Sequence, residues 1–101
     1  MITEKDLYGL RHYLYGEAFY GSSEGMRFRV ARVPLENVVF KKQEEQDAQN
    51  PKLKAEVWFT PFAYEKTPEE EITGKEFAFT DEGYREMVSW LNTVEASEGF
   101  R

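Results

Sequence analysis

The sequence predicts a small α+β protein. We expect an antiparallel four-stranded sheet with an N-terminal and a C-terminal helix packed on one face. Apolar and polar residues alternate in several segments, which is typical of strands with one buried face. Both ends of the chain instead show the apolar periodicity of a helix, preceded by a capping residue. Short turns between consecutive strands favour an antiparallel sheet, so the predicted order is α-β-β-β-β-α.

The C-terminal unit is the clearest part of this prediction. Phe77 and Phe79 alternate with polar or small residues, which predicts a strand over 72–79. Thr80 follows as an N-cap, because its hydroxyl can accept a free backbone N–H of the first helical turn. The helix is expected over 81–94, since five apolar residues then recur on one face. They are Tyr84, Met87, Val88, Leu91 and Val94.

The N-terminal segment has the same pattern. Thr3 is the expected cap, with Asp6 as its capping-box partner. Leu7, Leu10 and Leu14 then mark one helical face. Gly9 and Gly16 lie two turns apart on one side of this helix, so either another backbone comes close there or the helix ends at Gly16.

The middle of the chain supplies the other three strands. Residues 26–33 alternate clearly, and Pro34 suits the turn of a hairpin that continues over 38–42. A third strand is predicted over 53–60. Residues 22–25 and 41–52 are polar and rich in turn formers, so both are predicted to be loops, the second mobile.

Composition predicts one domain in a reducing compartment. The chain has 101 residues and no cysteine, which fits a single small domain, 1–101, whose tail frays from about residue 95. It has no apolar run of about 18 residues, so no membrane span or membrane partner is expected. The charged N-terminus lacks the apolar core of a signal peptide, which favours a cytoplasmic location.

Charge is unevenly distributed along the chain. Residues 26–54 carry seven bases and four acids, whereas residues 55–101 carry four bases and eleven acids. The net charge of −6 repels phosphate and makes general nucleic-acid binding an unfavourable expectation. The basic middle segment keeps a local exception open.

Motifs that indicate catalysis are absent from the sequence. It contains no Gly-x-Gly-x-x-Gly, no phosphate-binding P-loop and no Gly-x-Ser-x-Gly. A single histidine and no cysteine make a zinc site an unfavourable hypothesis, so we predict no metal and no cofactor. The acidic run Glu69-Glu70-Glu71 falls in a predicted turn, where a solvated charge cluster is the expected explanation.

Two groups of residues are candidate binding sites. Tyr8, His12 and Tyr15 are spaced four and three residues apart, which places them on one side of the predicted first helix. Such a stripe can stack against a ligand or a partner peptide. The alternative is that it forms only the half-buried edge of that helix.

The second group lies on the polar face of the predicted sheet. Arg27 and Arg29 alternate with the apolar residues of one strand, Arg32 follows nearby, and Trp58 occupies the polar face of another. Arginine beside an exposed aromatic ring is typical of protein interfaces and also of sites that stack nucleic-acid bases. Simple cross-strand pairing with Glu56 and Glu76 is the alternative that needs no ligand.

These observations favour a non-enzymatic protein-binding or accessory module that acts through its exposed sheet face. The partner would be an unknown protein or a second copy of the chain. The first alternative is a nucleic-acid-binding accessory protein that uses the basic segment 26–54. The second is a small enzyme or a transferase-like fragment. The basic groups of the first alternative are Arg27, Arg29, Arg32, Lys41 and Lys42.

Overall fold

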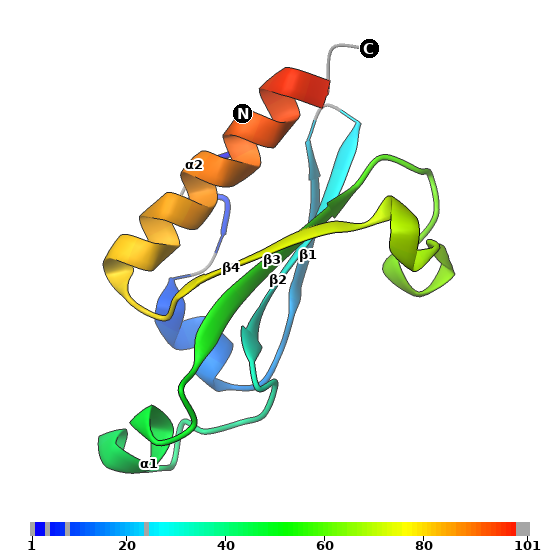
Figure 1. Cartoon of the computed structure of the whole chain (residues 1–101). Helices are drawn as coiled ribbons and strands as arrows, with labels where there is room; N and C mark the ends of the chain where they lie inside the picture. The colour runs from blue at the N-terminus through cyan, green and yellow to red at the C-terminus, as the bar shows by residue number, and fades with distance from the viewer. Residues whose placement is uncertain (1, 4, 8, 24, 99–101) are drawn as a thin grey trace.

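Four antiparallel strands form one sheet in the order β1-β2-β3-β4 (Figure 1). The strands are β1 (Phe19–Ser23), β2 (Met26–Val33), β3 (Lys52–Trp58) and β4 (Thr73–Ala78). The structure is a computed structural model, and it describes residues 2–3, 5–7, 9–23 and 25–98. The α+β class and the antiparallel four-stranded sheet are therefore confirmed, and the strands follow one another in space as they do in sequence.

Among the described residues, a single long helix covers the sheet. It is α2 (Asp81–Glu98), which packs against β3 and β4. The N-terminal segment runs beside α2 on the same side of the sheet (Figure 1). The remaining helical elements are short: η1 (Leu10–Leu14), α1 (Gln43–Asp47), η2 (Tyr64–Lys66) and η3 (Glu69–Glu71). No helix within the described ranges is long and apolar enough to cross a membrane.

The core lies between the sheet and this layer. Strand positions on the covered face, such as Met26, Val30 and Leu53, are fully buried. They meet Met87 and Leu91 of α2, which are also fully buried. The alternation in β2 and β3 and the apolar face of α2 therefore have the burial that their sequence patterns predicted.

The start of α2 agrees with its predicted cap. The Thr80 hydroxyl oxygen accepts the backbone N–H of Gly83 at 3.0 Å. A Cβ at Gly83 would lie 2.0 Å from the Ala78 carbonyl oxygen, so only glycine lets the end of β4 approach this turn so closely. The helix continues to Glu98, beyond Val94, where its end was expected, and Glu95 is buried.

The predicted N-terminal α-helix is wrong. Its only helical part is η1, a five-residue 3-10 turn. Before it, Asp6 Oδ2 accepts the Thr3 backbone N–H at 2.9 Å, so the expected capping pair forms but closes a single turn. The chain is then held by side chains of another element, because Asn92 of α2 binds both the N–H and the carbonyl of Ile2, each at 2.7 Å.

The sequence also misplaced one strand. Val38 to Phe40 form no strand, although Val38 is fully buried and donates its N–H to the Leu14 carbonyl at 2.7 Å. The fourth strand is instead β1, which begins before the predicted loop and includes its first two residues, Ser22 and Ser23. Gly21 is needed there because a Cβ would lie 2.6 Å from the Phe28 ring. Within the second predicted loop, residues 43–47 form α1.

Candidate functional site

The face of the sheet opposite α2 carries the candidate site. Strand register pairs Arg27 with Trp58 and Arg29 with Glu56, so these four side chains share that face. Tyr20 pairs with Arg29 from the other side and extends the row onto β1. The sequence therefore predicted correctly that Arg27, Arg29 and Trp58 lie together.

Arg29 is engaged within the molecule. Its Nη1 donates to Glu56 Oε1 at 3.2 Å, and its Nε donates to the Tyr20 hydroxyl oxygen at 3.2 Å. The guanidinium carbon also lies 5.0 Å from the centre of the Tyr64 ring. The cross-strand pairing of Arg29 with Glu56, considered above as the explanation that needs no ligand, is the one observed.

Trp58 is not exposed on this face. Only 2% of its surface is accessible, because the chain after β3 folds back over it. The indole Nε1 donates to the Phe62 carbonyl at 2.9 Å, and the Tyr64 ring lies 5.5 Å away, centre to centre. The expectation of an exposed tryptophan is therefore wrong. The alternation along the strand correctly placed Trp58 on the open face, but residues 62–64 cover it there. We call residues 60–67 the cover segment.

Hydrogen bonds fix the cover segment in place. The Tyr64 hydroxyl donates to both carboxylate oxygens of Glu56, each at 3.1 Å. The Thr67 hydroxyl donates to the Ala63 carbonyl at 2.9 Å and lies 3.2 Å from the Thr60 hydroxyl. Glu56 thus joins the sheet to the cover segment, since it also accepts from Arg29.

The shared carboxylate changes the acidity of its neighbours. Burial raises the pKa of the Tyr64 phenol above its ordinary 10.0, and the bond to Glu56 raises it further. Burial acts to lower the pKa of Arg29, but the bond to Tyr20 and the nearby oxygen atoms outweigh it, so that pKa is raised. Both donors therefore keep their protons across the physiological pH range.

Arg27 differs from Arg29 in having no such partner. Its side chain is exposed, and it forms no ion pair with any residue in the part of the chain that the structure describes. A hollow of about 300 Å³ lies beside it, bounded by Tyr20, Tyr64 and Glu65 and with Trp58 at its base. Tyr20 and Tyr64 meet edge to face with their ring centres 6.3 Å apart. We call Tyr20, Arg27 and Tyr64 the Arg27 patch.

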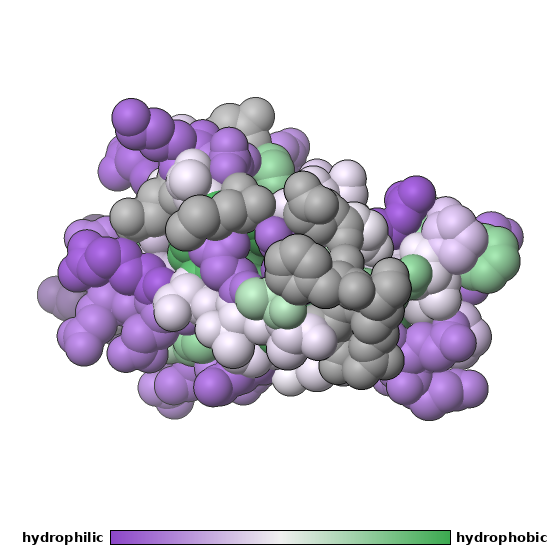
Figure 2. Space-filling model, turned by 90° about the horizontal axis from the view of Figure 1, so that it is seen from above, coloured by the Kyte–Doolittle hydropathy of each residue, from purple (hydrophilic) through white to green (hydrophobic). Residues whose placement is uncertain are grey.

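Apolar side chains are also exposed near the start of the cover segment. Phe59 and Phe62 have 40% and 55% of their surfaces accessible. Figure 2 looks onto the upper end of the molecule, where most residues are hydrophilic and a separate apolar patch lies at the right-hand end. On the face seen in Figure 2, exposed apolar area is thus localised.

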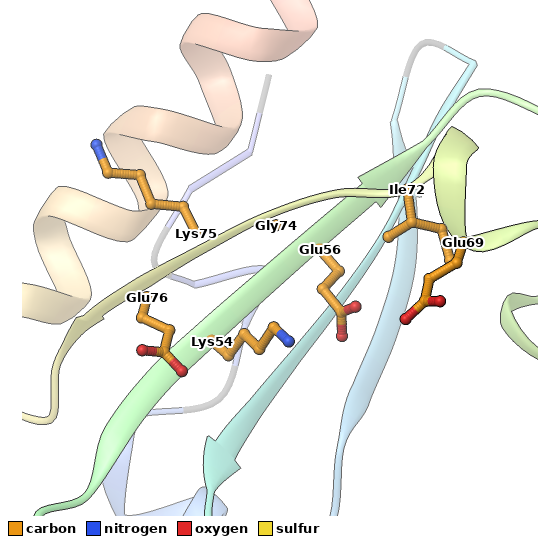
Figure 3. A pocket seen from close by; sticks show the side chains of 7 residues that line it. All are labelled: Lys54, Glu56, Glu69, Ile72, Gly74, Lys75 and Glu76. Atoms are coloured by element: carbon orange, nitrogen blue, oxygen red, sulfur yellow. The ribbon is translucent and has the colours of Figure 1, made fainter.

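A second hollow on the open face is mostly charged. It measures about 410 Å³ and lies over β3 and β4, with Gly74 as its floor (Figure 3). Lys54 extends between Glu76 and Glu56, and Glu69 of η3 points toward Glu56 (Figure 3). Lys75 points away toward α2, so three acids and one base, Lys54, face this hollow (Figure 3).

Arg32 is not part of the open face. It lies on the same side of β2 as Met26 and Val30 and is fully buried. Its Nη1 donates to the Pro34 carbonyl at 2.8 Å and its Nη2 to Gln49 Oε1 at 2.6 Å. Burial lowers the pKa of this guanidinium. The expectation that Arg32 lies near Arg27 and Arg29 is therefore wrong, because residue 32 is an even number of positions from Val30 and so faces the covered side of the sheet.

The first candidate stripe is not assembled as expected. Tyr8 lies outside the described residues. His12 and Tyr15 are three positions apart, and in a 3-10 turn this spacing still aligns them, although Tyr15 already follows η1. His12 is half-buried and meets the Tyr13 ring edge to face, whereas Tyr15 is 49% exposed.

Sequence reasoning missed Tyr20 and Tyr64, which complete the site. Tyr20 comes just before the predicted loop 22–25 and Tyr64 follows the predicted strand 53–60, and neither has a periodic signal of its own. Tyr20 can be recognised as a site residue only when Phe19–Ser23 is known to be a strand, because the strand register then pairs Tyr20 with Arg29. Nothing in the local sequence indicates that Tyr64 returns to Glu56.

Neither metal chemistry nor known relatives adds to this description. Within the described ranges, no group of three or more histidine or acidic side chains is placed to hold a metal ion. The chain matches no family model, and no curated protein or solved structure is significantly similar to it.

Proposed function

We propose that this chain is a non-enzymatic protein-binding module and that the Arg27 patch is its contact surface. The observation that carries the proposal is an exposed guanidinium, with no ion-pair partner among the described residues, beside two tyrosine rings and a hollow of about 300 Å³. Arginine and tyrosine are enriched at the energetic centres of protein interfaces. The partner class is a protein segment that presents a carboxylate next to an apolar side chain.

The rigidity of the surroundings supports this choice. Glu56 holds both Arg29 and Tyr64, so one wall of the hollow is fixed before any partner binds. A preformed wall lowers the entropy lost on association. A carboxylate from the partner would pair with Arg27, and its apolar neighbour would enter the hollow beside Tyr20 and Tyr64.

The nucleic-acid alternative has fewer basic side chains available to contact phosphate than the sequence suggested. Arg29 pairs with Glu56, Arg32 is buried against Gln49, and Lys41 lies 3.6 Å from Glu36. Arg27 and Lys42 remain exposed. Two separate cations on a chain of net charge −6 give weak attraction to a phosphate backbone.

Selection from a random peptide-display library tests the proposal. The selected peptides should be rich in Asp and Glu, and titration calorimetry should show that Arg27→Glu weakens them by at least about tenfold. Arg85→Glu is the matched control, because Arg85 is an exposed arginine on α2 and not part of the open face. Peptides that bind Arg27→Glu as well as the unmodified chain would refute the patch.

Oligonucleotide binding tests the alternative in the same preparation. We expect no measurable duplex DNA binding at about 0.15 M salt and at most weak single-strand binding below it. A sub-micromolar nucleic-acid complex at that salt, abolished by replacing Arg27 and Arg29 with alanine, would promote the alternative above the proposed function.

A further inference from the structure

The two edges of the sheet differ in charge. β1 and β4 are the outer strands, and neither outer edge is covered by another strand among the described residues. β4 carries Lys75 and Glu76 at its centre, which is a common protection against edge-to-edge pairing. β1 reads Phe-Tyr-Gly-Ser-Ser and carries no charge at all. An uncharged edge without proline is the one that accepts another strand.

The hairpin fixes which backbone groups of β1 face outward. Ser23 pairs with Met26, so only residues 24 and 25 connect β1 to β2. The residues that close such a two-residue turn form a hydrogen-bonded pair, and hydrogen-bonded and non-hydrogen-bonded pairs then alternate along the strands. The N–H and carbonyl groups of Tyr20 and Ser22 must therefore point away from β2, toward the free edge.

Space is available beside this edge. A hollow of about 290 Å³ is lined by Gly21, Ser22 and Phe28 together with Ile2 and Asp6 of the N-terminal segment. The described part of the chain thus does not fill the region next to the middle of β1. The side chains of Tyr20 and Ser22 lie on the open face of the sheet, where Tyr20 is 51% exposed and Ser22 is also exposed.

We infer that the β1 edge binds the β1 edge of a second copy of this chain, antiparallel, with Gly21 on the two-fold axis. This register pairs Tyr20 with Ser22 of the other copy, and Ser22 with its Tyr20. Each pair exchanges two N–H to carbonyl bonds, so four hydrogen bonds join the copies. The two four-stranded sheets become one continuous sheet.

The register at the axis favours this pairing over the alternatives. Residues that face each other across an antiparallel pair must lie on the same side of the sheet, so the two copies of Gly21 meet at a closely spaced pair. Glycine brings no side chain there. If β4 paired with β4 of a second copy instead, the two most central registers would place Lys75 against Lys75 or Glu76 against Glu76. Like charges directly opposite each other are destabilising.

The dimer is independent of the proposed protein partner, but it places the Arg27 patches in pairs. Tyr20 of each copy would lie opposite Ser22 of the other, and Ser22 is itself the neighbour of Arg27. The interface consists of one short strand from each copy, so the dimer is a weak one. Its dissociation constant falls in the micromolar to millimolar range.

Sedimentation equilibrium from about 1 μM to about 1 mM tests the inference with two variants at one position. Ser22→Pro removes an outward donor without removing any bond to β2, because edge strands tolerate proline where the N–H faces solvent. It should raise the dimer dissociation constant by at least about tenfold, since the donor is lost twice. Ser22→Thr keeps the donor and should dimerise like the unmodified chain.

Amide hydrogen exchange on the unmodified chain gives a second test that does not depend on how Ser22→Pro folds. The Tyr20 and Ser22 amides should become more protected as concentration rises, whereas those of Gly74 and Glu76 on the β4 edge should not change. A chain that stays monomeric throughout, a dimer unaffected by Ser22→Pro, or concentration-independent exchange at Tyr20 and Ser22 would overturn the inference.

Discussion

The two faces of the sheet are buried by different means. On the covered face, apolar residues such as Val30 and Leu53 meet the apolar stripe of α2, and burial is complete. On the open face, Trp58 is almost as well buried, but by the cover segment and a shared carboxylate. The comparison teaches that one face is specified by side-chain periodicity and the other by a few directional bonds.

The largest effect should come from the covered face. Leu91 is fully buried against the sheet, so Leu91→Ala should lower the free energy of unfolding by about 2–5 kcal/mol through lost burial and a residual cavity. Urea denaturation measures this difference. Ser89→Ala, at an exposed position on the same helix, should change the stability by less than about 0.5 kcal/mol. Similar stabilities for the two variants would contradict the position of the core.

The open face should respond less strongly and through a network. Glu56→Ala leaves Arg29 and Tyr64 without their shared acceptor, which should cost about 1–3 kcal/mol of unfolding free energy. Glu76→Ala is the matched control, because Glu76 is an exposed carboxylate on the neighbouring strand. If the two substitutions cost the same, Glu56 does not hold the cover segment.

The sequence predicted the covered face well because period-two and helical patterns report burial against a single layer. Phe28, Val57 and Leu91 were expected in the core and are buried there. Phe59 continues the alternation of Leu53 and Val57 in the predicted strand 53–60, but it is 40% exposed because β3 ends at Trp58. Periodicity cannot show where a strand stops.

Tertiary contacts explain the parts of the fold that the sequence did not predict. The β1 segment looked like a loop because Gly21, Ser22 and Ser23 favour turns, but pairing with β2 overrides that propensity. The N-terminal leucines showed helical spacing, yet Asn92 holds the backbone at Ile2 in a non-helical path. At the site, the return of Tyr64 to Glu56 has no local signal.

A smaller effect is expected from the buried arginine, Arg32, on the susceptibility of a neighbouring segment to proteolysis. Arg32 connects β2 to Gln49 beyond α1, so Arg32→Met should loosen residues 43–52 more than the sheet. These residues should be the first internal site of limited proteolysis, and the substitution should speed that cut about fivefold. Lys42→Met, at an exposed position, should leave the rate unchanged. Faster cutting within 81–94 instead would show that Arg32 supports the core.

The smallest effect concerns the N-terminal turn. A hydrogen bond from the Thr3 backbone N–H lowers the pKa of the Asp6 carboxyl below its ordinary 3.8. A second bond, from the Thr3 hydroxyl, makes a smaller contribution in the same direction. Because the folded-state pKa is the lower one, this carboxylate stabilises the fold above pH 3.8 and ceases to do so as pH falls through the folded value. An NMR titration should find the depressed pKa, and Thr3→Val should remove only part of the depression. An ordinary pKa would show that the turn does not form.

The central claim is that the cover segment folds back onto the open face and buries Trp58, which leaves Arg27 as the exposed arginine of that face. Hydrogen exchange of the two tryptophan indoles by NMR tests it most directly. Trp58 donates to the Phe62 carbonyl at 2.9 Å, whereas Trp90 is half-buried on α2 and serves as the internal reference. We predict that the Trp58 indole proton exchanges at least about tenfold more slowly than that of Trp90. Exchange of Trp58 at the rate of a free indole would contradict the account, because the tryptophan would then be open to solvent and to partners.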